Sequence, residues 1–268
     1  MGVSGADIAA DLQSAGQPLP EGHALHTLED RPDLHSTMES FGSSVWPEFM
    51  LNDAVADAHW QRMAADFPGY QLALLDGGGE IVSVARSAPL AWDGSPDDLP
   101  PGWDAQLSRS VAELERGLVP NTLGAIMIVT DPARRGDRLG GLTVTALKAC
   151  AGLHGLGALV ACVRPTLLEH YPLTSIEEYA AWTRDDGLPF DPWIRLHVRL
   201  GGRLSRPEPG SMLISGSVAA WEEWTGMAFP VSGPYVVPGA CAVVEVDRAS
   251  GMATYRDPNV WIIHDLGD

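Results

Sequence analysis

A short segment between residues 131 and 141 combines the residue types that bind anions. It carries Arg134, Arg135, Gly136, Asp137, Arg138, Leu139, Gly140 and Gly141. Glycines let successive backbone N–H groups converge, a helix start adds partial positive charge, and arginines add full charges. We therefore predict that these residues bind a pyrophosphate. A plain helix start with solvent-facing arginines is the alternative that the segment alone leaves open.

The spacing within this segment separates it from two familiar phosphate-binding motifs. It lacks the Gly-Lys-Ser/Thr of a Walker loop, and it does not read Gly-x-Gly-x-x-Gly. An apolar run at 124–130 precedes it and predicts a buried strand. An Ala/Leu-rich run that ends in glycines follows at 142–157 and predicts a helix, and residues 158–165 predict a second buried strand.

The rest of the chain predicts elements that would position these strands. Residues 1–22 indicate a short amphipathic helix and a Pro/Gly linker, and 23–34 a strand and a turn. Residues 35–68 have helical periodicity with breaks near Gly42 and at Trp46–Pro47. Two apolar runs, 70–75 and 81–88, flank Asp76-Gly77-Gly78-Gly79 and predict a hairpin, and a helix follows at 106–118. This order predicts an α/β (α+β) fold, a mixed sheet with helices on both faces.

The amino-acid composition argues against several classes of function. The chain has 268 residues, with 17 basic against 35 acidic side chains and a formal charge of −18. Such a field repels nucleic-acid backbones and favours cationic small molecules, although an acidic surface also simply keeps a protein soluble. We find no apolar run that could span a membrane and no signal peptide. The three distant cysteines indicate a cytoplasmic protein with neither a disulfide framework nor a cysteine metal site.

The strand, the sequence Pro-x-x-Arg-Gly-x-x-Leu-Gly at 132–140 and the following helix together resemble the GCN5-related N-acetyltransferase (GNAT) superfamily. Its motif, roughly Arg/Gln-x-x-Gly-x-Gly/Ala, binds the pyrophosphate of acetyl-CoA. Arg135 matches the first position and Gly140 the last, but Arg138 replaces the central glycine. The resemblance implies a centrally splayed sheet that holds acetyl-CoA or another acyl-CoA. It also implies that the strand residues Ile128, Val129 and Thr130 bind the thioester through their backbone.

A second match lies at 191–202, where the family has a helix over the pantetheine arm. Asp191 is expected at the N-cap and at the cofactor site, with Pro192 at the first helical position. His197 takes the place of the tyrosine that protonates the CoA thiolate in many relatives. A structural histidine is the alternative reading. Tyr171, within an insertion at 165–190, is the second candidate for the thiolate acid.

The sequence does not identify the general base. Many relatives carry a glutamate on the strand that here spans 124–130, and this chain has none. Side chains of the insertion are candidates, although solvated helix residues are the simpler reading: Glu169, His170, Glu177 and Glu178. Downstream, residues 205–268 predict further strands that complete the sheet. Five tryptophans there and just upstream either line an acceptor pocket or cover the end of the sheet: Trp182, Trp193, Trp221, Trp224 and Trp261.

These observations predict three parts, a helix and linker (1–22), an acyl-CoA-binding core (23–204) and a β-rich extension (205–268). The favoured function is an acyl-CoA-dependent N-acyltransferase that acts on a small-molecule amine, with no metal, nucleic acid or membrane partner. Two alternatives stay open. One is an acyltransferase or decarboxylase that uses a carrier-bound acyl thioester, and the other is a non-catalytic CoA-binding module. A homodimer is compatible with the sequence.

Overall fold

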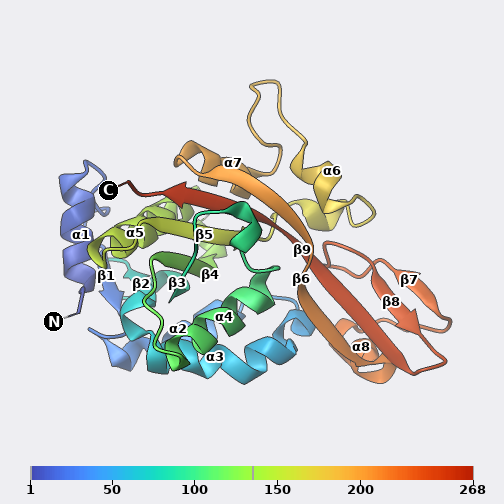
Figure 1. The fold of residues 1–268 in the computed structure, drawn as a ribbon. Helices are drawn as coiled ribbons and strands as arrows, with labels where there is room; N and C mark the ends of the chain where they lie inside the picture. The colour runs from blue at the N-terminus through green and yellow to red at the C-terminus, as the bar shows by residue number, and fades with distance from the viewer. Residues whose placement is uncertain (1, 135, 268) are drawn as a thin grey trace.

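A nine-stranded mixed sheet forms the centre of the protein, as seen in a computed structural model that describes residues 2–134 and 136–267 (Figure 1). The strands are β1 (Ala24–Thr27), β2 (Leu72–Leu75), β3 (Ile81–Leu90), β4 (Thr122–Thr130), β5 (Ala158–Val163), β6 (Arg203–Ser217), β7 (Gly233–Tyr235), β8 (Val244–Asp247) and β9 (Met252–Asp265). Their order is β1-β2-β3-β4-β5-β9-β8-β7, and β6 also pairs with β9. The predicted fold class is confirmed.

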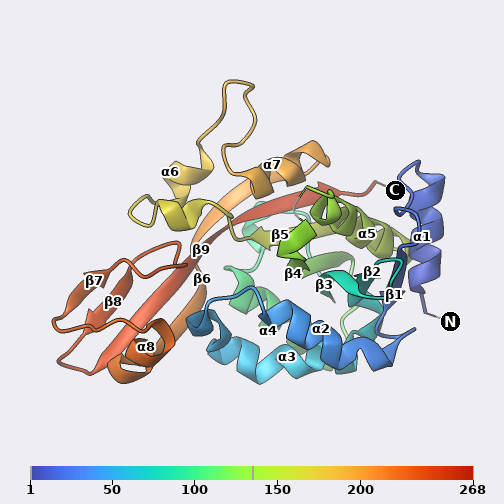
Figure 2. The same ribbon diagram turned by 180° about the vertical axis from the view of Figure 1, so that it is seen from behind.

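Helices cover both faces of the sheet (Figure 2). They are α1 (Gly5–Ser14), α2 (His35–Ser43), α3 (Ala54–Asp66), α4 (Trp103–Glu115), α5 (Leu139–Leu153), α6 (Ile176–Ala180), α7 (Pro192–Arg199) and α8 (Val218–Thr225). Helices α1 and α5 pack together on one face, whereas α2, α3 and α4 lie on the other. The helices on each face bury a separate apolar cluster against the sheet, so the sheet separates two hydrophobic cores.

The two central strands separate partway along their length. Strands β4 and β5 pair in parallel only from Thr122↔Ala158 to Ala125↔Ala161. Beyond that point β4 continues to Thr130, whereas β5, which pairs with β9 along its whole length, ends at Val163. The edge of β4 from 126 to 130 that faces β5 therefore has no strand partner within the described residues. This is the splay that the family resemblance implies.

A bulge in β4 marks the start of the splay. Arg86 of β3 pairs with Met127 and Ser87 pairs with Ala125, which leaves Ile126 as the extra residue. Helix α4 holds this irregular backbone, because Trp103 Nε1 donates to the carbonyl of Ile126 (2.7 Å). The α4 residue Gln106 likewise donates to the Ala125 carbonyl (3.2 Å).

The C-terminal region differs from its prediction at one element. Residues 218–225 form helix α8, not a strand. The hydroxyl of Ser217 caps the helix by accepting from the amide of Ala220, and Gly226 ends it in the left-handed conformation. Val218 and Trp221, three residues apart, bury one helical face, so the apolar pattern has a helical period rather than the alternation of a strand.

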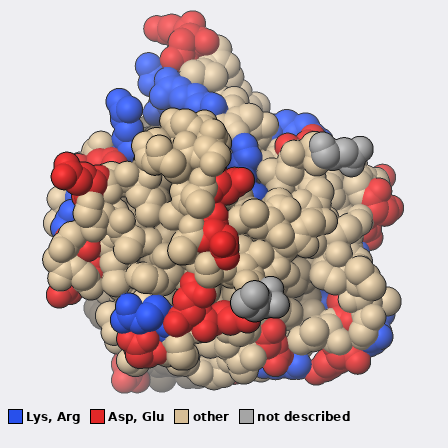
Figure 3. Space-filling view, turned by 90° about the vertical axis from the view of Figure 1, so that its left-hand side faces the viewer, with Lys and Arg blue, Asp and Glu red and all other residues tan. Residues whose placement is uncertain are grey.

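The predicted boundary at 204/205 falls inside β6, and β9 lies beside β5 in the middle of the sheet. The last strand is therefore part of the central sheet and borders the splay. On the face that Figure 3 shows, acidic side chains lie in several separate places rather than in one block. No helix among the described residues is both long and apolar enough to cross a bilayer.

Candidate active site

A cavity of about 710 Å³ opens at the splay and runs between the two central strands toward α2 and α3. We distinguish three parts of its lining. The splay end is lined by Ile128, Thr130, Gly140, Trp193 and His197. The middle is lined by Arg164, Asp257 and Asn259, and the tryptophan end by Glu39, Trp46, Asp57, Trp60 and Trp103.

The predicted anion-binding segment leads into the splay end. Arg138 is the N-cap of α5 and adopts φ 61°, the left-handed region that glycine favours. The residue that replaces the family's central glycine thus keeps a glycine-like backbone. Within the described residues, no group accepts a hydrogen bond from the amides of Gly140 and Gly141. Two free amides at a helix start fit a phosphate group.

The glycines of α5 also allow α7 to approach closely. A Cβ atom at Gly140 would lie 3.0 Å from the Trp193 ring, and one at Gly141 would lie 3.3 Å from Leu196. Arg134 is directed away, since its guanidinium pairs with Asp76 in the β2–β3 turn. Arg135 lies outside the described residues, so its role stays a prediction from the sequence.

Of the three predicted strand residues, Ile128 and Thr130 line the cavity. The side chain of Val129 is buried on the opposite face, among the apolar residues beneath α2. This alternation is the ordinary period of a strand. Any contact of Val129 with a ligand must therefore be made by its backbone.

Asp191 is the N-cap of α7, as predicted, and accepts from the amides of Trp193 (2.8 Å) and Ile194 (3.1 Å). Its other oxygen accepts from the Leu167 amide (2.9 Å) and from the Tyr179 hydroxyl (3.0 Å). The side chain is buried, and these hydrogen bonds tie the insertion to α7. Its effect on a cofactor would thus be to hold the α7 wall in place.

His197 lies at the splay end and is 1% exposed. Its Nδ1 is 2.9 Å from Nε2 of His264 on β9, and its Nε2 has no partner among the described residues. Burial, with a smaller effect of His264, lowers the pKa of His197 to about 3. Burial and then the charge of Lys148 lower the pKa of His264 to about 4. Both imidazoles are therefore neutral near pH 7.

Gly202 makes this histidine pair sterically feasible. A Cβ atom there would lie 2.8 Å from the His197 carbonyl oxygen, from His264 Cε1 and from Ile262 Cγ2. Tyr171, the second candidate for the thiolate acid, lies elsewhere. It packs against Tyr179, Trp182 and Phe190 in the insertion and does not line the cavity. The four candidates for the base in the insertion are exposed and lie outside the lining as well: Glu169, His170, Glu177 and Glu178.

The middle of the cavity holds a buried ion pair. Arg164, directly after β5, donates from Nε to Asp257 Oδ1 on β9 (2.9 Å). Asp257 is fully buried and also accepts from the Tyr255 hydroxyl (2.5 Å) and from Asn259 Nδ2 (3.0 Å). The carboxylate is thus compensated by one cation and two further donors, as a buried charge requires.

The tryptophan end is aromatic and acidic. Trp60 stacks near Trp103, with ring centroids 6.4 Å apart, and donates from Nε1 to Glu39 Oε2 (2.7 Å). The other Glu39 oxygen pairs with the buried guanidinium of Arg86. Asp57 adds a second, exposed carboxylate. Aromatic faces beside carboxylates suit an ammonium or guanidinium group.

A second carboxyl pair lies behind this end. Asp53 caps α3 and is fully buried, and Asp104 lies in the first turn of α4. Burial raises the pKa of Asp53. Burial and then the charge of Asp53 raise the pKa of Asp104 to about 7. The two carboxyl groups therefore share a proton near neutral pH.

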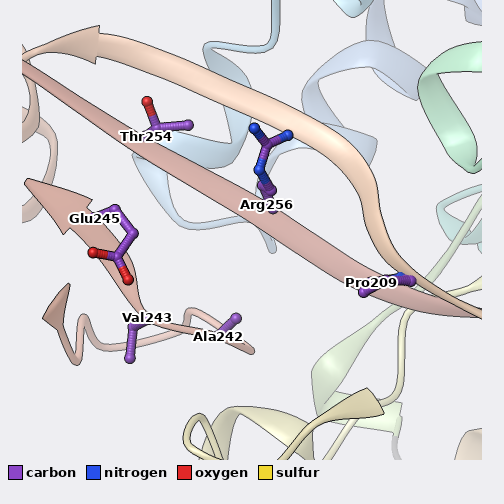
Figure 4. Close-up of a pocket in the computed structure, with 6 residues that line it drawn as sticks. All are labelled: Pro209, Ala242, Val243, Glu245, Thr254 and Arg256. Atoms are coloured by element: carbon purple, nitrogen blue, oxygen red, sulfur yellow. The ribbon is translucent and has the colours of Figure 1, made fainter. Parts of the chain in front are cut away.

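The remaining candidates lie outside this cavity. Of the five tryptophans proposed for an acceptor pocket, only Trp193 lines it, and Trp221 and Trp261 are fully buried in the core. No cluster of three metal-binding side chains is found among residues 2–134 and 136–267. A smaller hollow of about 390 Å³ lies between β6, β8 and β9, around Glu245 and Arg256 (Figure 4). Since Arg256 and Asp257 are adjacent on β9, the two hollows lie on opposite faces of that strand.

Sequence reasoning missed most of the middle and the tryptophan end. Arg164 and Asp257 are 93 residues apart, and no local spacing connects them. His264 was likewise unrecognised, because its partner lies 67 residues earlier. The one signal in the sequence was the position of Arg164, a charged residue directly after a predicted buried strand.

No protein-family model matches the chain. It is 33% identical, over an alignment of 288 residues, to the arginine N-acetyltransferase avaD of Aspergillus versicolor, covering 96% of this chain and 98% of that protein. Two solved structures share the fold. The loading GNATL domain of CurA from Lyngbya majuscula has a TM-score of 0.55 at 17% identity, covering 91% of this chain and 98% of that one. The GphF GNAT-like decarboxylase in complex with isobutyryl-CoA has a TM-score of 0.55 at 19% identity, covering 90% and 98%.

Proposed function

The chain belongs to the GCN5-related N-acetyltransferase superfamily and is an acyltransferase, and from that premise we propose that it transfers an acyl group, acetyl in the first instance, from CoA to the amine of a small cationic molecule of the arginine class. One observation carries this proposal. A single cavity joins the unpaired edge of β4 and the start of α5 to an acidic, aromatic chamber.

The residues of the splay end fit acyl-CoA. The free amides of Gly140 and Gly141 would bind the pyrophosphate, together with Arg138 and Arg135 of the segment. The pantetheine arm would lie along the open edge of β4 beneath α7, where Trp193 and His197 form the opposite wall. Bound acyl-CoA supplies an electrophilic thioester. Backbone amides near Ile128 would polarise its carbonyl.

In the proposed reaction the acceptor nitrogen attacks the thioester carbon directly. A C–N bond forms, the C–S bond breaks, and the proton lost by the amine ends on the CoA sulfur. We assign the last step to His197. A hydrogen bond from His264 Nε2–H to His197 Nδ1 would place the His197 proton on Nε2, the atom without a protein partner. His197 then donates to the sulfur as a neutral imidazole, and it would regain a proton from the amine.

The acceptor class follows from the tryptophan end. Glu39 and Asp57 carry two carboxylates, and Trp60 offers an aromatic surface beside them. This lining favours a cationic group over a neutral or anionic one. The 33% identical relative is named for arginine, which has such a group.

Binding and turnover test the proposal separately. Acetyl-CoA should raise the melting temperature, and adding L-arginine should release free thiol. Gly140→Ala should weaken acetyl-CoA binding about 10-fold or more, because its Cβ would meet Trp193 at 3.0 Å. Gly152→Ala is a matched control on the same helix, where a Cβ meets nothing within 4 Å. A wild-type protein that acetyl-CoA does not stabilise, or that never releases thiol with any amine, would contradict the proposal.

A further inference from the structure

Arg164 occupies the point where the acceptor must meet the thioester. It directly follows β5, just beyond Ala161, the last residue of β5 that pairs with β4. Its side chain lines the cavity and is 18% exposed. The open edge of β4 lies across the splay. A group bound to Arg164 would therefore lie near the thioester that the proposed function places on that edge.

The guanidinium is held in place by its partners, but not all of its N–H donors have an acceptor. Nε donates to Asp257, Nη2 donates to the Gly239 carbonyl (2.7 Å), and the group lies 5.8 Å from the centroid of the Trp46 ring. Nη1 has no acceptor among the described residues, and it is not among the buried atoms that lack one. It is therefore accessible to a ligand. A planar guanidinium fixed on one side offers N–H donors that match a carboxylate.

The opposite end of the cavity has the reverse charge. Glu39 pairs with the buried Arg86 and accepts from Trp60 Nε1. The carboxylate left for a ligand is therefore that of Asp57, which is exposed and has no ion-pair partner among the described residues. A molecule that spans the cavity would thus place an anion at Arg164 and a cation near Trp60. An α-amino acid with a cationic side chain has this distribution, and its α-amine is adjacent to its carboxylate.

We propose that Arg164 binds the α-carboxylate of an amino-acid acceptor, so that the α-amine, and not the side chain, is acylated. This inference rests on the proposed function. It adds that the acceptor must carry a carboxylate, that this carboxylate sets the acceptor's orientation, and that Arg164 binds it. Asp257 and Trp46 are positioning residues for Arg164. Removal of the acceptor's carboxylate would leave accessible N–H donors of Arg164 unpaired in a narrow cavity.

The test compares acceptors that share a guanidinium. Wild-type protein with acetyl-CoA should use L-arginine with a kcat/KM at least about 10²-fold above that of agmatine or L-argininamide, which lack the carboxylate. Mass spectrometric fragmentation should locate the acetyl group on the α-nitrogen. Arg164→Lys should reduce the preference to within about 10-fold, since a lysine keeps the charge but loses the planar pair of donors. Arg203→Lys, at an exposed arginine outside the cavity lining, should keep the full preference.

The outcomes separate the two proposals. Absence of turnover with every amine would overturn the proposed function. Turnover without a preference for the carboxylate, or acetylation of the side chain, would overturn the role of Arg164 alone. Malonyl-CoA decarboxylation that depends on Arg164, without a carboxylate preference in the acceptor, would assign Arg164 to the acyl group instead. Should Arg164→Lys fail to fold, the wild-type comparison of the three acceptors still decides the question.

Discussion

The pair of His197 and His264 couples the last strand to the helix over the splay. Each imidazole is buried and neutral, so neither contributes a charge near pH 7. What the pair supplies is a defined tautomer, because a hydrogen bond donated by His264 Nε2 to His197 Nδ1 leaves the proton of His197 on Nε2. A residue of this kind acts by hydrogen bonding and proton relay rather than by its own ionisation.

Replacement of His197 should therefore affect turnover more than binding. We expect His197→Ala to lower kcat about 10²-fold or more, the usual scale for a positioned proton donor, with acetyl-CoA affinity nearly unchanged. Calorimetry and thiol release measure the two quantities. His170→Ala, at an exposed histidine outside the cavity, is the control. Full activity of His197→Ala would exclude His197 as the proton donor.

At the scale of elements, the start of α5 combines a strained residue with a helix terminus. Arg138 is the one non-glycine residue with positive φ among the described residues. This conformation costs an L-residue about 1–2 kcal/mol, and glycine adopts it freely. The family's glycine has thus been replaced by a side chain at a cost in backbone energy. We attribute that replacement to an added charge beside the phosphates.

The substitution Arg138→Gly separates these two effects. We expect unchanged or slightly higher stability, by up to about 1 kcal/mol, together with weaker CoA affinity. Urea unfolding and calorimetry measure the two. Arg116→Gly is a matched control, since Arg116 has φ −84° at the end of α4 and glycine there should only destabilise. CoA affinity that is unchanged in Arg138→Gly would show that the side chain points away from the phosphates.

Elements with their own local signals were predictable from the sequence. The β2–β3 hairpin follows from its two apolar runs, and α7 from Asp191 and Pro192 at its start. Helix α8 was missed because its cap at Ser217 directly follows a long strand, so the alternating pattern seemed to continue. Only one part of the candidate site could be predicted from the sequence. The splay end lies in local motifs, whereas Arg164, Asp257 and His264 meet only through the pairing of β9.

For the whole molecule, the Asp53–Asp104 pair makes stability depend on pH. Raised pKa values mean that the folded state binds a proton more tightly than the unfolded chain, whose aspartates titrate near pH 4. Between about pH 4 and 7 the native state thus carries more bound protons, and this contribution to stability falls as pH rises. The buried histidines act in the opposite direction between about pH 3 and 6.5, because the unfolded state binds their protons more tightly.

Comparison with Asp104→Asn isolates the carboxyl pair. We expect the free energy of unfolding of this variant, relative to wild type, to increase from pH 5 to pH 8 by more than about 1 kcal/mol, the value of one pKa unit. Urea titrations at both pH values measure it. Asp97→Asn, at an exposed aspartate, should show no such change. A pH-independent difference for Asp104→Asn would mean that the pair shares no proton.

Strand β9 has a consequence for the order in which the protein is made. It lies between β5 and β8 and supplies Asp257, Asn259 and His264, yet it is the last strand of the chain. While the ribosome is still translating residues 252–265, the nascent chain exposes β5 as an unpaired edge, with apolar residues that invite mispairing. Completion of the sheet and assembly of the middle of the cavity are thus one event, which has to wait until β9 has been made.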